Sequence, residues 1–190
     1  MLAFAGARSI DLVLSSDDVA RALKTGKGTE AERARFHSAY LVPLQAVDPA
    51  LERMEVLTEF RRAVLDAEDH LRLGDHMFSV RQATEALRPW RGKLTLSLHL
   101  RFHPHNVLVS VPAYVMLFAE PGPTPLAVRR TPLFTLAPDA QKPGAPTSLY
   151  GGIVEVDFDA AKAGQTSRVV QVLLDGKELA HTTINLARLE

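Results

Sequence analysis

The sequence predicts an α+β protein: an antiparallel β-sandwich of immunoglobulin-like size, with about six to eight strands and an N-terminal helical segment packed beside it. Two observations predict this class. Before Pro89 the apolar residues recur every three or four positions, as in helices, and after it they alternate, as in strands. In addition, nine of the twelve prolines lie between Pro104 and Pro146, where rigid loops would connect the strands.

The change of period divides the chain near residue 92. Residues 1–92 are predicted to form an N-terminal strand and helices, either beside the sandwich or as an insertion within it. Residues 93–190 are predicted to form the sandwich itself. Because no flexible linker separates the two parts, we expect one cooperative unit.

Start signals for helices recur in the first half. Alternating apolar residues predict a short strand over 9–14, and the serine and two aspartates at 16–18 then predict a first helix. Thr29 and Glu32 form a capping box, in which each side chain binds the other residue's backbone amide. This box predicts a second helix that runs to about residue 40.

A longer third helix is predicted after Asp48 and Pro49, because aspartate is a good N-cap and proline suits the first helical position. Gly74 is the expected end of this helix, and a capping box over 79–82 predicts a fourth helix that closes at Pro89. The apolar stripe of the third helix would comprise Leu51, Met54, Leu57, Phe60, Val64, Ala67 and Leu71.

The second half shows a period of two. Residues 93–103 alternate between leucines or phenylalanine and polar residues, which predicts a strand with one buried face. Residues 106–118 are mainly apolar at odd and even positions alike, as in a central strand with both faces buried, and Pro112 would cause a bulge or break. Asp175 and Gly176 predict a tight hairpin turn, and further strands are expected over 126–136, 148–158, 168–174 and 178–189.

Composition excludes several classes of function. Lys and Arg total 22, as do Asp and Glu, and neither half of the chain is polarised, so we expect no nucleic-acid partner. No stretch approaches ~20 apolar residues, so we expect no membrane span. The absence of cysteine excludes disulfides, thiolate metal sites and cysteine nucleophiles.

The first seven residues leave the compartment open. Ala3, Ala5 and Ala7 have the A-x-A spacing that precedes a signal-peptide cleavage site, but a basic region and most of an apolar region are missing. Residues 1–7 are therefore either a signal-peptide remnant or a plain apolar lead-in. The first interpretation implies export, to the periplasm or the exterior of a bacterial cell.

Three histidines lie close together in the sequence, at His99, His103 and His105. His99 and His103 would be about 13 Å apart along a strand, too far to share a metal. His103 and His105 flank Pro104 in a predicted turn and could both reach a divalent transition metal, such as zinc or copper, if a third ligand converges there. Asp139 and Asp175 are the candidate third ligands. The alternative is that His103 caps the turn and His99 lies on a solvated face.

No catalytic residue is assigned from the sequence. It contains no G-x-S-x-G elbow, no phosphate-binding loop and no G-x-G-x-x-G motif. The charged residues of the third predicted helix fit ion pairs on a solvated face: Glu55, Glu59, Arg62, Asp66 and Asp69. The alternating acidic residues Glu155, Asp157 and Asp159 are likewise expected to face water.

The topology nevertheless predicts where a ligand would bind. If each strand after residue 93 reverses at its turn, the segments 103–105, 137–147 and 175–177 lie at one end of the sandwich, where such folds usually bind. The candidate ligand-binding residues are His103, His105, Asn106, Asp139, Gln141, Lys142 and Lys177.

A β-sandwich with rigid loops and no recognisable catalytic set favours a non-catalytic binding or assembly module. We expect its partner to be a protein, or a second copy of the chain, since a net charge of zero favours self-association. The alternative is a metal-binding protein or metal-dependent enzyme centred on His103 and His105.

Overall fold

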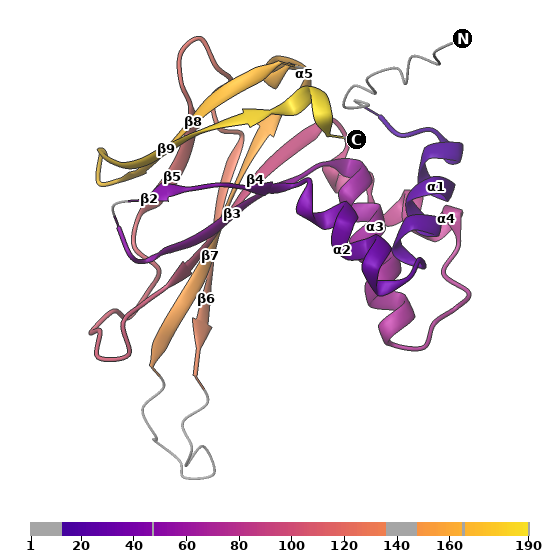
Figure 1. The fold of residues 1–190 in the computed structure, drawn as a ribbon, viewed down its shortest axis with the longest axis horizontal. Coiled ribbons are helices and arrows are strands. Elements are labelled where there is room, and N and C mark those ends of the chain that lie inside the picture. Colours follow the sequence, from indigo (N-terminus) through magenta and orange to yellow (C-terminus); the bar gives the residue numbers. More distant parts are fainter. Residues whose placement is uncertain (1–12, 47, 136–147, 165, 190) are drawn as a thin grey trace.

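A computed structural model describes residues 13–46, 48–135, 148–164 and 166–189. Nine strands form two antiparallel sheets, which pack face to face (Figure 1). The five-stranded sheet has the order β1-β3-β4-β7-β6, comprising Leu41–Val42, Leu51–Leu57, Lys93–Arg101, Leu149–Asp159 and Ala127–Phe134. The four-stranded sheet has the order β2-β9-β8-β5, comprising Gln45–Ala46, Lys177–Asn185, Ser167–Leu174 and Tyr114–Phe118.

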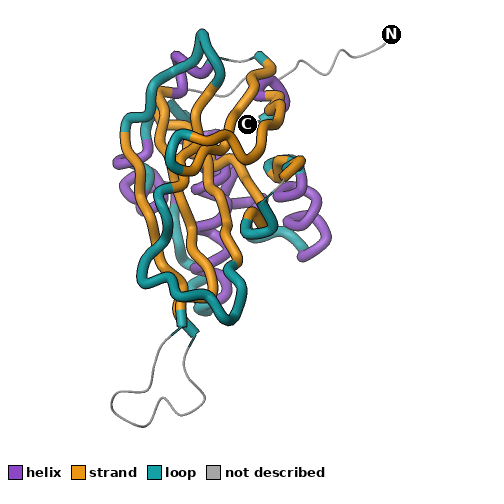
Figure 2. Tube along the Cα trace, turned by 90° about the vertical axis from the view of Figure 1, so that its left-hand side faces the viewer, coloured by secondary structure: helices purple, strands orange, loops and turns teal. Residues whose placement is uncertain are grey.

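Four helices gather on one side of the sandwich, and Figure 2 shows them behind the strands. They are α1 (Ser16–Gly26), α2 (Glu30–Ser38), α3 (Glu59–Arg72) and α4 (Val80–Ala86), followed by the 3-10 turn η1 (Arg88–Trp90). Two short elements, α5 (Ala160–Ala163) and η2 (Leu186–Arg188), follow β7 and β9. The predicted class, an α+β chain with an antiparallel sandwich and N-terminal helices, is confirmed.

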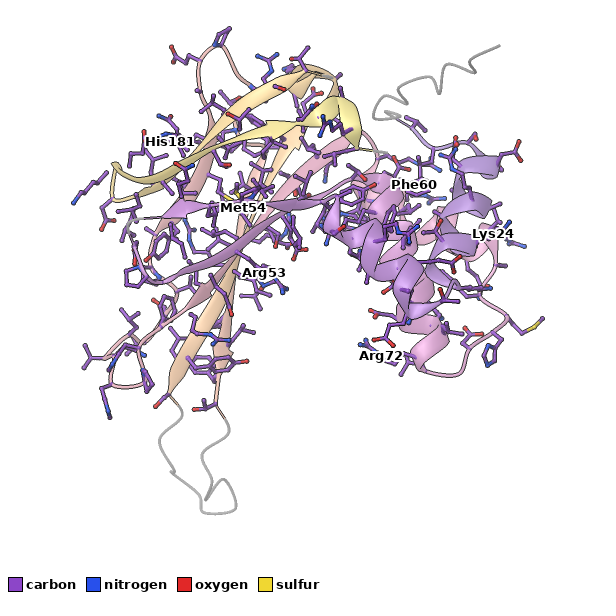
Figure 3. All side chains as sticks on the ribbon, in the orientation of Figure 1. Lys24, Arg53, Met54, Phe60, Arg72 and His181 are labelled. Atoms are coloured by element: carbon purple, nitrogen blue, oxygen red, sulfur yellow. The ribbon has the colours of Figure 1, made fainter. Side chains whose placement is uncertain are left out.

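The buried apolar residues of the described ranges form two clusters. One fills the space between the sheets and includes Met54, Leu98, Met116 and Phe158. The other fills the space between the helices, where Phe60 lies. Figure 3 shows Arg53 and Met54, neighbours on β3, pointing to opposite sides of the sheet, and Phe60 among the helices. The face of the five-stranded sheet that turns away from the four-stranded sheet is called the outer face below.

The sandwich begins earlier in the sequence than predicted. Strands β1, β2 and β3 all precede residue 92, and β3 is paired directly with β4. The segment from α3 to η1 is therefore an insertion between two neighbouring antiparallel strands. That the helices and the sandwich fold as one cooperative unit stays a prediction.

The predicted helix that starts at Asp48 is wrong in its first part. Residues 51–57 form β3, and the helix begins only after the N-cap Thr58. A β-bulge between Leu51 and Arg53 explains the misleading spacing. The extra residue lets Leu51 and Met54, three positions apart, both face the core, so a bulged strand imitates a helical stripe.

The prediction of a central strand over 106–118 is also wrong. Only β5 is a strand there, and it lies at the edge of the four-stranded sheet. Residues 102–113 form an irregular loop, bracketed by two prolines that cannot donate to a ladder. Val107 and Val109, expected to be buried, are 92% and 89% exposed.

Other local predictions are confirmed. The capping boxes at Thr29 and Ser79 are both present, and Gly74 follows the end of α3 with φ of 78°. Asp175 and Gly176, with φ of 50° and 79°, form the turn between β8 and β9. Of the strand predicted over 9–14, only Val13 and Leu14 are among the described residues, and neither is in a strand.

None of the helices in the described part of the chain is both long enough and apolar enough to cross a membrane.

Candidate functional site

A pocket of about 570 Å³ lies at one end of the sandwich, called the end pocket below. It is formed where the segment between β2 and β3, the end of β4, the following loop and the start of β5 meet. Its lining consists of Asp48, Pro49, Ala50, Arg101, Phe102, His103, Pro104, Asn106, Leu108, Pro112 and Tyr114. Most of this surface is apolar, as is usual for ligand sites.

Asp48 joins the two sheets at the back of the end pocket. Its Oδ2 accepts a hydrogen bond from the Tyr114 hydroxyl at 2.9 Å, and its Oδ1 accepts one from the Ala50 amide at 2.9 Å. Burial, together with the bond to this carboxylate, raises the pKa of Tyr114 above its ordinary value. The phenol therefore stays protonated and acts as a donor to Asp48.

Asn106 holds the loop between β4 and β5 in place. Its Nδ2 donates to the carbonyls of His103 and Leu149, at 2.7 and 2.8 Å, and its Oδ1 accepts from the Leu108 amide at 2.9 Å. His103 Nδ1 accepts a further bond from the His105 amide at 3.2 Å. The polar groups of this loop are thus largely paired with one another.

A close contact anchors the far end of the same loop. Gly152 on β7 has no Cβ, and one placed there would lie 2.5 Å from a methyl group of Val111. Val111 is 8% exposed and belongs to the core between the sheets. The glycine therefore lets the loop pack against the five-stranded sheet.

Apolar side chains remain exposed around the end pocket. Val107 and Val109 are 92% and 89% exposed, and Leu108 between them is 36% exposed and lines the pocket. Three consecutive aliphatic residues at a loop tip beside an apolar pocket make a surface suited to covering by another apolar group.

The structure brings some of the predicted site residues together. His103 and Asn106 line the end pocket. His105 does not, although its ring centroid is 5.4 Å from that of His103. Lys177 lies at the same end of the four-stranded sheet as Tyr114, because Leu174 on β8 pairs with Tyr114 on one side and with Lys177 on the other. It is two strands away from Tyr114 and does not line the pocket. The other predicted ligand-binding residues, Asp139, Gln141 and Lys142, lie outside the described residues.

For the metal hypothesis, the described residues contain no cluster of three or more His, Cys, Asp or Glu side chains that could hold an ion. His103 Nδ1 is already engaged by the His105 amide. Asp139, one of the two predicted third ligands, lies outside the described residues. A metal site at His103 and His105 therefore stays a hypothesis.

A group of paired charges lies elsewhere, on the outer face of the five-stranded sheet. Glu55 accepts hydrogen bonds from Arg61 and from His99, whose Nε2 lies 2.6 Å from Glu55 Oε1. Arg61 is 3% exposed and also donates to the Val56 carbonyl. Although burial alone would raise the pKa of Glu55, the bond from His99 and the charge of Arg61 lower it to about 2.

A second series of contacts lies beside those of Glu55 and extends to the helices. Arg129 binds both carboxylate oxygens of Asp157, at 2.5 and 2.8 Å. Thr95 donates to the same carboxylate at 2.7 Å and accepts from Arg62 at 2.8 Å. The Arg62 guanidinium lies over the ring of Trp90, 3.7 Å from its centroid. These contacts and those of Glu55 are called the outer-face network below.

The expectation of solvated charges is wrong for Glu55, Glu59 and Asp157, which are buried, whereas Asp69, with 63% side-chain exposure, is solvated as expected. Asp157 is 1% exposed, and Glu59, at 6%, is buried with a pKa that burial raises. Glu55 is in a strand and not in a helix. His99, expected on a solvated face, is bonded to Glu55. Through Arg61, Arg62 and Trp90 the network links α3 and η1 to the sheet, so it holds the inserted helices in place.

Sequence reasoning missed Asp48 and Tyr114, the two residues that define the back of the end pocket. Asp48 looked like a helix cap, and Tyr114 looked like part of an apolar strand. The only available signal was the density of prolines around them, which indicates rigid loops without showing which loops meet. No protein-family model, no curated protein and no solved structure matches the chain.

Proposed function

We propose that the chain is a non-catalytic binding module whose end pocket takes an apolar group of a protein partner. The observation that carries this proposal is the apolar pocket of about 570 Å³ beside the exposed Val107 and Val109. Exposed aliphatic residues around a preformed pocket are typical of surfaces that another molecule covers.

The hydrogen bonding of the lining indicates the chemistry of the bound group. Both oxygens of Asp48 and all the polar groups of the Asn106 side chain already have partners within the protein. A polar ligand group placed against Asp48 or Asn106 would have to break these bonds or stay unpaired, which costs about 1–3 kcal/mol for each buried group. The exposed side chains of Arg101 and His103 also line the pocket and are the groups that could meet a polar atom of the ligand. An apolar side chain carries no such cost and gains about 25 cal/mol for each Å² it buries.

The test is a fluorescence titration of the full chain with 8-anilinonaphthalene-1-sulfonate, an anionic dye whose aromatic rings brighten when they leave water. We expect saturable binding that Leu108→Asp weakens by at least about tenfold, because a carboxylate then faces the apolar pocket. The matched control is Leu73→Asp, since Leu73 is an 81% exposed leucine that follows α3 and lies outside the pocket lining. It should bind the dye like the wild type. Equal loss in both variants, or in neither, would contradict the proposal.

Whether the partner is another protein or a second copy is decided by light scattering. A second copy would give a concentration-dependent dimer that Leu108→Asp dissociates. A mass that stays at 20.8 kDa over the accessible concentrations would exclude a second copy as the partner at those concentrations.

The alternative, a metal-binding function at His103 and His105, rests on the 5.4 Å separation of the two rings. Elemental analysis of purified protein tests it directly. One equivalent of zinc or copper that is lost on His105→Ala would favour this alternative. Metal below stoichiometry, unchanged in the variant, would favour the apolar binding module.

A further inference from the structure

The four edges of the two sheets differ in how open they are. In the five-stranded sheet one edge is β1, and in the four-stranded sheet one edge is β2, each only two residues long. The other edge of the four-stranded sheet is β5, where Met116 is 0% exposed and Phe118 is 6% exposed. The remaining edge is β6, with eight residues, none of them buried.

The hydrogen bonding of β7 shows which groups of β6 face outwards. Phe102 N–H donates to the carbonyl of Tyr150 at 2.8 Å, and Ala160 N–H donates to the carbonyl of Gly92 at 2.9 Å. Along an antiparallel strand, the N–H and C=O of one residue point to the same side, and successive residues point to opposite sides. The even-numbered residues of β7 therefore bond to β4, and the odd-numbered residues bond to β6.

It follows that β6 also bonds to β7 through its odd-numbered residues, since Arg129 pairs with Glu155 and Thr131 with Ile153. Val128, Arg130 and Pro132 then direct their main-chain groups away from the sheet. Pro132 has no N–H, so its position on this side costs no hydrogen bond, as expected of a proline in an edge strand. These two N–H donors and three carbonyls, to which no other described residue is bonded, form the open edge.

The side chains along this edge are mainly apolar, and the charged side chain among them is that of Arg130. Leu126, Val128 and Phe134 are 57%, 36% and 45% exposed. Arg130 is exposed, and its guanidinium donates to the carbonyl of Tyr114 at 2.9 Å. Among the described residues, no carboxylate forms an ion pair with it. By contrast, its neighbour Arg129 is paired with Asp157 and Glu155.

We propose that the open edge of β6 binds an extended segment of another protein, as an added strand with a carboxylate opposite Arg130 and apolar side chains opposite Val128 and Pro132. The main-chain groups of the edge supply hydrogen bonds to any extended chain. Arg130 supplies the charge selectivity, because an opposite charge directly across two strands is favourable and a like charge is not.

The same charge argues against a second copy of this chain as the occupant. Two β6 strands related by a twofold axis at Arg130 would place the two Arg130 side chains directly opposite each other. The two proline residues would also remove a hydrogen bond from each end of the pair. An acidic segment of another protein avoids this repulsion, because it places a carboxylate opposite Arg130.

The probe is the synthetic peptide acetyl-Thr-Val-Thr-Glu-Thr-Val-Thr-amide, which reads the same in both directions. The central Glu therefore lies opposite Arg130 whether the added strand is parallel or antiparallel. A control peptide has Lys in place of Glu. By titration against the full chain, we expect the Glu peptide to bind roughly threefold to tenfold more tightly than the Lys peptide.

Charge reversal of the protein makes the test specific. Arg130→Glu should invert the preference, so that the Lys peptide binds more tightly. The control Arg72→Glu changes an arginine of 77% side-chain exposure on α3, far from β6 in Figure 3, and should leave the preference unchanged. The same preference in both variants would overturn the proposal, since the charge selectivity would then not come from Arg130.

Hydrogen exchange of the wild-type chain gives an answer even if Arg130→Glu does not fold. The amides of Val128 and Arg130 should exchange more slowly when the Glu peptide is bound, because they then donate to it. Unchanged exchange at these two amides under saturating peptide would overturn the proposal, as would a slowing confined to the end pocket.

Discussion

The end pocket and the outer-face network differ in what surrounds their paired polar groups. In both regions the polar side chains are largely paired with one another: Asp48 with Tyr114 at one, Asp157 with Arg129 at the other. At the end pocket, however, the aliphatic residues Val107 and Val109 remain exposed around a cavity. On the outer face the paired charges connect the sheet to the inserted helices.

The difference shows that a concentration of charged residues is a poor guide to function in this chain. The outer-face network contains buried charge pairs such as Glu55 with Arg61, but the structure uses them to fix the position of α3 and η1. The surface available to a partner is instead defined by apolar side chains that the fold leaves uncovered.

Replacing Arg61 should destabilise the protein most. Arg61→Met leaves the Glu55 carboxylate buried without its main cation, and such losses cost about 3–5 kcal/mol. Arg53→Met is the matched control, because Arg53 contacts the same carboxylate at 3.7 Å from a side chain that is 56% exposed. It should cost below about 1 kcal/mol, as exposed ion pairs do. Urea unfolding measures both, and equal losses would contradict a structural role for the buried pair.

Acid should weaken the same network. The pKa of Glu55 is about 2 in the folded protein, below the ordinary value of 4.5 that applies when the chain is unfolded. Its contribution is therefore fully present above about pH 4.5 and is lost as the pH falls towards 2, by about 3 kcal/mol in total. Comparing unfolding free energies at several pH values, Glu55→Gln should show a shallower loss than the wild type. Parallel curves would refute this assignment.

Gly152→Ala should disturb the end pocket without changing its lining. The new methyl group would collide with Val111 and displace the loop, which we expect to cost about 1–3 kcal/mol and to weaken dye binding. In a Val111→Ala background the same substitution should cost less, since the opposing methyl groups are gone. A double-mutant cycle measures this coupling. Purely additive effects would show that Val111 does not anchor the loop.

Leu108→Asp should have the smallest effect on stability, within about 0.5 kcal/mol, because the side chain is 36% exposed and packs at a surface. Its effect on dye binding should nevertheless be large. Thermal unfolding and titration of the same sample separate the two. A large loss of stability would mean that Leu108 supports the fold and is not a binding residue.

The sequence was informative wherever a local rule determines the structure. The alternation over 93–103 correctly predicted β4, and the Asp175–Gly176 pair correctly predicted a turn, because strand period and left-handed backbone geometry depend on neighbouring residues. The helix starts at Thr29 and Ser79 follow from bonds within four residues.

Features that depend on distant contacts could not be predicted. Leu51 and Met54 share a face only because a bulge in β3 adapts that strand to β4. Glu55 and His99 are 44 residues apart, and Asp48 and Tyr114 are 66 apart, so no spacing rule connects them. At the site, His103 and Asn106 were predicted from their position after a strand, whereas Asp48 and Tyr114 required the three-dimensional structure.

We propose the end pocket as the place where this protein binds an apolar group. The most direct measurement is an NMR titration of the isotope-labelled full chain with 8-anilinonaphthalene-1-sulfonate. We predict that the largest amide shifts fall in residues 48–50 and 101–114, around the pocket lining. Shifts centred on the helices or on β6, with those two segments unaffected, would contradict the claim.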